Sequence, residues 1–273
     1  FGVRQAAVFN QDVSVADHRI LRNASVSYQD AFAKRWTAWV TASYAERAPS
    51  ITEQYAFYIF NAYDGYDYVG QVDLRSEKSI QVDAGIEFKH EKISVRGTGF
   101  YYQIFDYILG KTDPVLDEMT IGANGVKVST NIPAANLSGG NLEVSYSPIE
   151  SIELRSVGTY TYGQTEAGDP LPLIPPFKNV SSLRWSHKNG FVQFEFEGTL
   201  SQTRTNSDFG ESQTAGYAIM NLRAGHHFRF GDKRLSLNAG IENLTDRRYR
   251  SHLDWGGIPR PGINGFLNVS FTF

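Results

Sequence analysis

Apolar and polar residues alternate along most of the chain with a period of two. In the stretch 79–89 (SIQVDAGIEFK), Ile80, Val82, Ala84 and Ile86 fall on one face, and polar or small residues fall on the other. Because successive side chains of a β-strand point to opposite faces, this pattern predicts strands. No long helical periodicity competes with it. We expect about twelve strands, at 1–8, 21–28, 33–45, 78–89, 92–106, 136–147, 151–163, 178–187, 190–202, 215–229, 233–243 and 264–273.

The predicted connections alternate strictly between short and long. The short ones lie at 29–34, 90–91, 147–150, 188–189 and 231–232, and the long ones at 46–77, 107–135, 164–177, 203–214 and 244–263. An antiparallel up-and-down arrangement would place every tight turn at one end and every long loop at the other. That asymmetry is typical of bacterial outer-membrane barrels, whose turns are periplasmic and whose loops are extracellular. The strand lengths also suit a membrane, which a tilted strand crosses in about nine to eleven residues.

The polar faces carry charges that a dry protein core would not accept, among them Asp83, Glu87, Glu195 and Glu197. The opposite faces are too apolar to meet water. Lipid outside and an aqueous lumen inside satisfy both faces. The pattern therefore predicts an all-β fold, a transmembrane antiparallel up-and-down β-barrel, with residues 1–273 forming one part of it.

Composition narrows the function classes further. The 273 residues carry a net charge of −3, 41% hydrophobic residues and no cysteine, and the mean hydropathy is −0.34. Because the net charge is slightly negative, no overall positive charge indicates a nucleic-acid partner. Disulfide scaffolds, cysteine metal sites and thiol catalysis are excluded. No run of eighteen apolar residues predicts a membrane helix, and no secretory leader is recognisable at the N-terminus.

Two loop segments are candidates for ligand contact. The first is aromatic and carries interleaved carboxylates: Tyr55, Phe57, Tyr58, Tyr63, Asp64, Tyr66, Asp67 and Tyr68. It suits an extracellular ligand-contact loop, or alternatively an aromatic girdle with loop packing. The second is basic and holds Arg247, Arg248 and Arg250, followed by His252. It suits an anionic ligand or a lipopolysaccharide phosphate, or alternatively a solvated loop.

The sequence contains little that indicates a catalytic site or a metal site. His226 and His227 are adjacent on a predicted strand and therefore point to opposite faces, which prevents them from sharing one ion. The carboxylates Glu87, Glu195 and Glu197 are expected on any wet channel wall, and no nucleophile elbow, phosphate loop or zinc-protease helix motif appears. We expect no enzyme activity, no resident metal and no cofactor.

The C-terminal third resembles the end of a TonB-dependent outer-membrane receptor. Its features are ENLTDRRY at 242–249, PRPG at 259–262, and a last strand that ends in Phe273. Upstream, ERAPSITEQY at 46–55 and VDLRSEKSIQVDAGIEF at 72–88 are similar to mid-barrel segments of the family, although Arg75 and Ser76 depart from its usual Lys-Pro. The aromatic loop resembles the copper-receptor branch, but Met119 and Met220 are the only methionines, and soft-metal ligation is not supported.

The resemblance implies a barrel of twenty-two strands closed by an N-terminal plug, of which this chain supplies about twelve C-terminal strands and no plug. It implies uptake of a scarce solute, such as a ferric siderophore or another metal chelate, energised through TonB by way of the missing N-terminal part. It implies that the barrel-assembly machinery reads the face formed by Leu267, Val269, Phe271 and Phe273. Two alternatives stay open, a complete twelve-stranded passive channel and an outer-membrane barrel enzyme.

Overall fold

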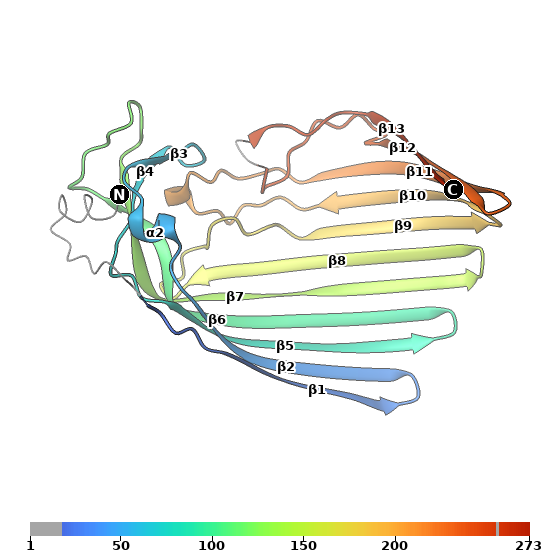
Figure 1. Cartoon of the computed structure of the whole chain (residues 1–273), viewed down its shortest axis with the longest axis horizontal. Coiled ribbons are helices and arrows are strands. Elements are labelled where there is room, and N and C mark those ends of the chain that lie inside the picture. Colours follow the sequence, from blue (N-terminus) through green and yellow to red (C-terminus); the bar gives the residue numbers. More distant parts are fainter. Residues whose placement is uncertain (1–17, 255–256) are drawn as a thin grey trace.

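The computed structural model describes residues 18–254 and 257–273. They form one long antiparallel sheet with a lobe of loops at one end (Figure 1). The strands that build the sheet are β1 (Asn23–Ala33), β2 (Trp36–Arg47), β5 (Glu77–His90), β6 (Ile93–Asp113), β7 (Val126–Ile149), β8 (Ile152–Thr165), β9 (Lys178–His187), β10 (Gly190–Thr199), β11 (Tyr217–Phe230), β12 (Lys233–Glu242) and β13 (Asn264–Thr272). The strand expected at 1–8 lies outside the described residues.

Each of these strands pairs with its neighbours in the chain, in the order β1-β2-β5-β6-β7-β8-β9-β10-β11-β12-β13. This order confirms the up-and-down arrangement. The two ends of the sheet, β1 and β13, are not paired with each other. The described strands therefore do not close on themselves.

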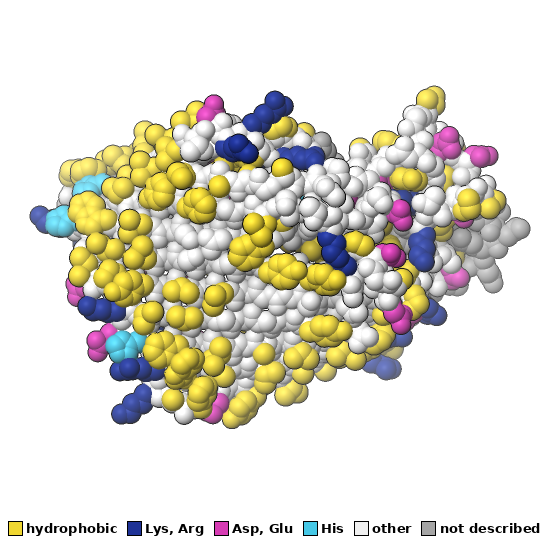
Figure 2. Space-filling model, turned by 180° about the vertical axis from the view of Figure 1, so that it is seen from behind, with side chains coloured by type: hydrophobic (Ala, Val, Ile, Leu, Met, Phe, Trp, Pro, Cys, Tyr) yellow, Lys and Arg dark blue, Asp and Glu magenta, His cyan; other side chains and the backbone are white. Residues whose placement is uncertain are grey.

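The two faces of the sheet are reversed relative to those of a soluble protein. In β5, the apolar residues Ile80 and Val82 are 51% and 41% exposed, whereas the polar residues Gln81 and Asp83 on the opposite face are less exposed and half-buried. The register carries the apolar row across the sheet: Val82 pairs with Tyr101 of β6, and the other strands continue it. Figure 2 shows hydrophobic side chains spread along the strands, with charges gathered near the turns and over the loops. Monomeric soluble proteins rarely expose so large an apolar surface.

The alternation of turns and loops is confirmed, with two corrected boundaries. Five tight turns lie at one end of the strands and the long connections lie at the other (Figure 1). The expected turn at 29–34 is wrong, because β1 continues to Ala33 through a shift in register between Asp30 and Ala33. The expected loop at 107–135 is also too long, since β6 and β7 stay paired up to Asp113 and Val126.

The second error has a local cause at Asp106. This residue has a φ of 53° within β6, and it interrupts the alternation that the sequence pattern follows. Pro133 occupies the facing position on β7, between Ile132 and Ala134, which pair with Tyr107 and Phe105. Proline offers no N–H to the ladder, so the pattern reads as a strand end. The side-chain amide of Asn131 donates to the Asp106 carbonyl at 2.6 Å and helps to hold the two strands together across the interruption.

The connection between β2 and β5 forms the first part of the loop lobe. Its helix α2 (Ile51–Tyr55) begins with a capping box in which Ser50 and Glu53 exchange hydrogen bonds. A hairpin follows, β3 (Ile59–Asn61) with β4 (Tyr66–Val69), and β4 pairs in parallel with the extension of β7, where Tyr68 faces Lys127. The predicted aromatic loop is thus folded onto β7. Among the described residues, no helix is long and apolar enough to cross a bilayer.

Candidate functional site

A buried lysine lies at the centre of the loop lobe. The side chain of Lys127 on β7 is 0% exposed, and its ammonium donates to Asp64 Oδ2 at 2.7 Å. The same ammonium donates to the backbone carbonyl of Asp208 in η1 (Ser207–Phe209), a short 3₁₀ helix in the loop between β10 and β11. The rings of Tyr66 and Phe209 lie over it, with centroids at 4.2 and 4.5 Å. A desolvated ammonium gains from such contacts, and here it joins three separate segments of the chain.

The carboxylate of Asp64 is satisfied on both oxygens. Tyr68 donates its hydroxyl to Oδ2 at 2.7 Å, and the backbone N–H of Tyr66 donates to Oδ1 at 3.2 Å. Burial raises the pKa of the Tyr68 phenol, and the hydrogen bond to Asp64 raises it further. The phenol therefore remains a neutral hydrogen-bond donor. It supports the ion pair and does not act as a base.

Asp67 anchors the next loop. Its Oδ2 accepts the backbone N–H groups of Met119 and Thr120, each at 2.8 Å. Burial raises the pKa of Asp67, but the hydrogen bonds from Thr120 and Met119 outweigh that effect and leave it below its usual value. The carboxylate thus fixes the loop between β6 and β7. The four residues Asp64, Tyr66, Asp67 and Tyr68 lie inside the lobe, as the packing alternative predicted.

A second buried polar contact joins Glu211 and His252, whose side chains are 1% and 2% exposed. Their Oε1 and Nε2 atoms are 3.5 Å apart, and His252 Nδ1 contacts the Thr214 hydroxyl at 3.0 Å. Glu211 also accepts the backbone N–H groups of Leu173 and Asn206. Burial raises the pKa of Glu211, but the hydrogen bonds from His252, Asn206 and Leu173 prevail and hold it below its usual value.

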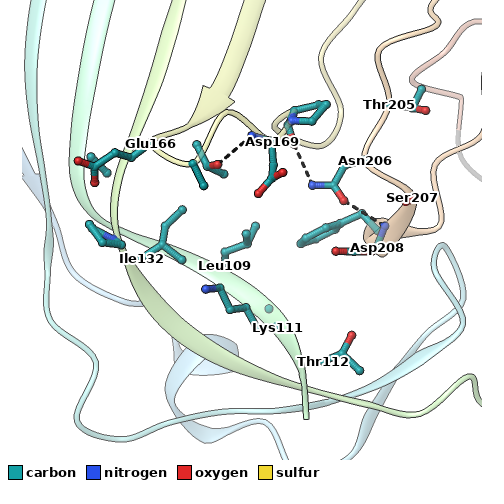
Figure 3. A pocket seen from close by; sticks show the side chains of 17 residues that line it. Leu109, Lys111, Thr112, Ile132, Glu166, Asp169, Thr205, Asn206, Ser207 and Asp208 are labelled. Carbon is teal, nitrogen blue, oxygen red and sulfur yellow. Dashed lines mark hydrogen bonds between the residues drawn. The ribbon is translucent and has the colours of Figure 1, made fainter. Parts of the chain in front are cut away.

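A cavity of about 760 Å³ lies beside these buried contacts, between the extended ends of β6 and β7 and the loop that carries η1. Figure 3 shows Leu109, Lys111 and Ile132 on one side and residues from Thr205 to Asp208 on the other. The loop between β8 and β9 adds Glu166 and Asp169. Within the described residues, the side chains of Lys111, Glu166, Asp169 and Asp208 form no ion pair. The cavity can therefore offer both charge signs and apolar contacts to a polar solute.

The basic segment lies at a smaller hollow of about 320 Å³, lined by Tyr217, Tyr249 and the three predicted arginines. The two tyrosine rings contact each other with centroids 4.3 Å apart. Arg250 donates to the Ser212 hydroxyl at 2.9 Å, which ties this loop to its neighbour. Arg247 and Arg248 are exposed. The sequence identified this cluster, whereas the burial of His252 was missed.

Charges on the polar face of the sheet form pairs across the strands. Lys178 approaches Glu197 at 2.8 Å, and Arg223 lies 3.7 Å from Glu195 and 3.4 Å from Glu242. Paired, partly hydrated charges of this kind suit a wet wall. On the edge strand β13, Leu267, Val269 and Phe271 are exposed, as is Phe273 just beyond it, and the polar residues between them are exposed as well.

Sequence reasoning missed Lys127, Glu211 and Asp208, which organise the lobe. Lys127 fell in a predicted loop, although the residues Val126 and Val128 on either side could have indicated a strand. No sequence signal marks a buried lysine or the backbone carbonyl it binds. Within the described part of the chain, no group of three or more His, Asp or Glu side chains could hold a metal ion.

The chain is similar to known proteins of one family. A family model described as "TonB dependent receptor-like, beta-barrel" matches residues 1–244. A search of curated protein sequences finds no significant match. Among solved structures, the copper transporter OprC is 23% identical with a TM-score of 0.79, and the alignment covers 93% of this chain and 40% of that one.

Siderophore receptors are similar to a comparable degree. A mutant ferric enterobactin receptor, PfeA, from Pseudomonas aeruginosa in complex with enterobactin is 23% identical with a TM-score of 0.71, over 91% of this chain and 40% of that one. The siderophore receptor PirA from Acinetobacter baumannii is 19% identical with a TM-score of 0.69, over 91% and 40%. The chain spans about 40% of the length of these structures.

Proposed function

The chain belongs to the TonB-dependent receptor β-barrel family, and on that premise we propose that it forms part of the wall and the extracellular loops of an active-transport receptor for a metal chelate, such as a ferric siderophore. TonB-dependent receptor barrels are outer-membrane proteins, and the family and its structural neighbours are receptors and transporters. In the proposal, the loop lobe is the extracellular end and the tight turns are periplasmic. The chain captures and guides solute and performs no covalent chemistry.

The observation that carries the proposal is a loop lobe with a polar cavity at one end of a sheet whose exposed face is apolar. The apolar face suits hydrocarbon, and the paired charges on the other face suit a hydrated interior. A chelate fits the described residues better than bare copper does, because Met119 lies in the loop between β6 and β7 and Met220 on the apolar face of β11. With two methionines and no cysteine, the 273 residues offer few of the soft sulfur ligands that select copper(I).

Solute contact is proposed for the 760 Å³ cavity and for the arginine hollow beside it. Ferric chelates are often anionic, and the exposed guanidinium groups of Arg247 and Arg248 can attract them through charge-assisted hydrogen bonds. Tyr55, Phe57, Tyr58 and Tyr63 remain candidate aromatic contacts at the rim of the lobe.

Uptake by whole cells tests the proposal. Cells that carry or lack the full-length gene are given ⁵⁵Fe-labelled enterobactin, other ferric siderophores or copper under metal limitation. We expect gene-dependent uptake of at least one chelate. Collapse of the proton gradient or loss of TonB should abolish uptake but leave surface binding intact. Uptake that persists under both conditions would identify a passive channel and refute active transport.

A further inference from the structure

One short segment of the lobe contacts several separate loops. We call residues 206–211 the strap segment; it contains η1 and part of the cavity wall. The Asn206 amide donates to the carbonyl of Pro170 at 2.8 Å, in the loop between β8 and β9. Glu211 binds His252, which belongs to the loop between β12 and β13. The Asp208 carbonyl accepts from Lys127 on β7. Two connections and the strand β7 thus hold the same six residues.

The strap segment is also stabilised by contacts within itself and by close packing against the Asp64 turn. Asn206 caps η1, because its Oδ1 accepts from the backbone N–H of Asp208 at 3.1 Å. Gly210 ends η1 with a φ of 67°, and a Cβ added there would lie 2.6 Å from Asp64 Cα. Only glycine permits that close approach of two backbones. The strap segment therefore packs as a formed unit against the turn that carries Asp64.

Lys127 has a special place among these contacts because it is fully buried and binds a backbone carbonyl. Its ammonium has three donors, and Asp64 and the Asp208 carbonyl engage two of them, while the rings of Tyr66 and Phe209 cover the rest. The bond to a carbonyl does not depend on which side chain stands at position 208. It constrains where the strap segment lies.

We propose that Lys127 is a positioning residue: with Asp64, it holds the strap segment against β7 and so sets the wall of the 760 Å³ cavity. The cavity wall then keeps one shape whether or not solute is present. That this wall shapes a solute site rests on the proposed function, whereas the position of the strap segment does not.

A spectroscopic experiment on the full-length receptor in detergent tests the positioning directly. The 273 residues contain no cysteine, so after replacement of any cysteine elsewhere in the receptor by serine, a nitroxide can be placed at the exposed Ser207 by a Ser207→Cys substitution. The test variant is Lys127→Met/Asp64→Asn, which removes the ammonium without leaving a buried carboxylate unpaired. We expect the Ser207 label to become at least threefold more mobile by electron paramagnetic resonance. A second label at the exposed Glu118, in the loop between β6 and β7, reports whether the whole lobe has loosened.

A matched control removes another ion pair of the lobe. Arg260→Met/Asp254→Asn breaks a bridge of 2.7 Å in the loop between β12 and β13 that forms no bond with the strap segment, and it should leave the Ser207 label unchanged. The proposal is overturned if the Ser207 label stays as immobile in the test variant as in the parent. It is equally overturned if the Ser207 label in the control variant, or the Glu118 label in the test variant, responds as strongly. None of these results depends on identifying a solute, so the proposed function can fail separately.

Discussion

A single charge placed on the apolar face of β5 tests the membrane assignment most directly. Ile86 lies on that face, pairs with Ala38 and Gly97, and is 43% exposed. Ile86→Arg adds a guanidinium that points away from the polar face. If the apolar face meets lipid, the charge enters hydrocarbon, and the free energy of unfolding should fall.

The expected size follows from the depth of Ile86. It lies five residues before the turn at Glu91. With a rise of about 3.3 Å per residue and a strand tilt of about 40°, each residue advances about 2.5 Å along the membrane normal. Ile86 therefore lies about 13 Å from the turn, near the middle of an apolar band about 25 Å tall. Arginine at the midplane of such barrels costs about 2–4 kcal/mol.

The assay is reversible unfolding of the full-length receptor from phospholipid vesicles in guanidinium chloride, followed by tryptophan fluorescence and by heat-modifiable gel migration. The matched control is Thr37→Arg, which places the same side chain on the polar face of the neighbouring strand β2. Thr37 pairs with Glu87, so the new charge meets a carboxylate. We expect the control to change the free energy of unfolding by less than about 0.5 kcal/mol. Equal stability of Ile86→Arg and the parent, or a larger loss in Thr37→Arg, would show that the faces are assigned backwards.

Three further predictions concern the lobe and the last strand. Lys127→Met leaves the buried Asp64 carboxylate unpaired and should destabilise the lobe by about 3–5 kcal/mol, measured as faster amide exchange at 126–128. The double variant Lys127→Met/Asp64→Asn should recover part of the loss, and unchanged exchange in the single variant contradicts the argument. Because the pKa of Glu211 is lowered in the folded state, the stability that this carboxylate contributes is present above its unfolded pKa of about 4.3 and is lost as the pH falls through the folded pKa. Amide exchange of residues 203–214 should therefore accelerate below about pH 4. A Glu211→Gln variant whose exchange accelerates over the same pH range would disprove the assignment. Deletion of Phe273 should lower the amount of receptor at the cell surface, measured by surface labelling, whereas Ser270→Ala on the opposite face should not. Normal surface levels after the deletion argue against a role of Phe273 in assembly.

The sheet was predictable because its pattern is local and repeats in every strand. The rows of Ile80, Val82 and Ile86 on β5 and of Leu267 and Val269 on β13 alternate without interruption, and their facing positions are polar. A single interruption hid the extension of β6 and β7. The φ of 53° at Asp106 cannot be seen in the sequence, and its partner Pro133 looks like a strand terminator.

The lobe was much less predictable, because its stability comes from contacts between distant segments. The aromatic loop was recognised by composition, yet composition could not distinguish Tyr66 and Tyr68, which surround an ammonium, from residues that face solvent. The partners of Lys127 lie 63 and 81 residues away. His252 was read as part of a basic loop, and its buried partner Glu211 belongs to another connection. Neighbouring strands predict each other, but buried charge pairs between loops do not.

The spacing of these partners has a consequence for how the protein matures. Each hairpin of the sheet can zip up from its own tight turn using contacts close in sequence, which are kinetically inexpensive. The Lys127 cluster joins β7 to the connection between β2 and β5 and to that between β10 and β11. The Glu211 cluster adds the connection between β12 and β13, so neither cluster can form until the intervening strands are in register. We therefore expect the lysine to be buried only after β5 to β10 have paired, and an exchange probe directed at it would time that stage of assembly.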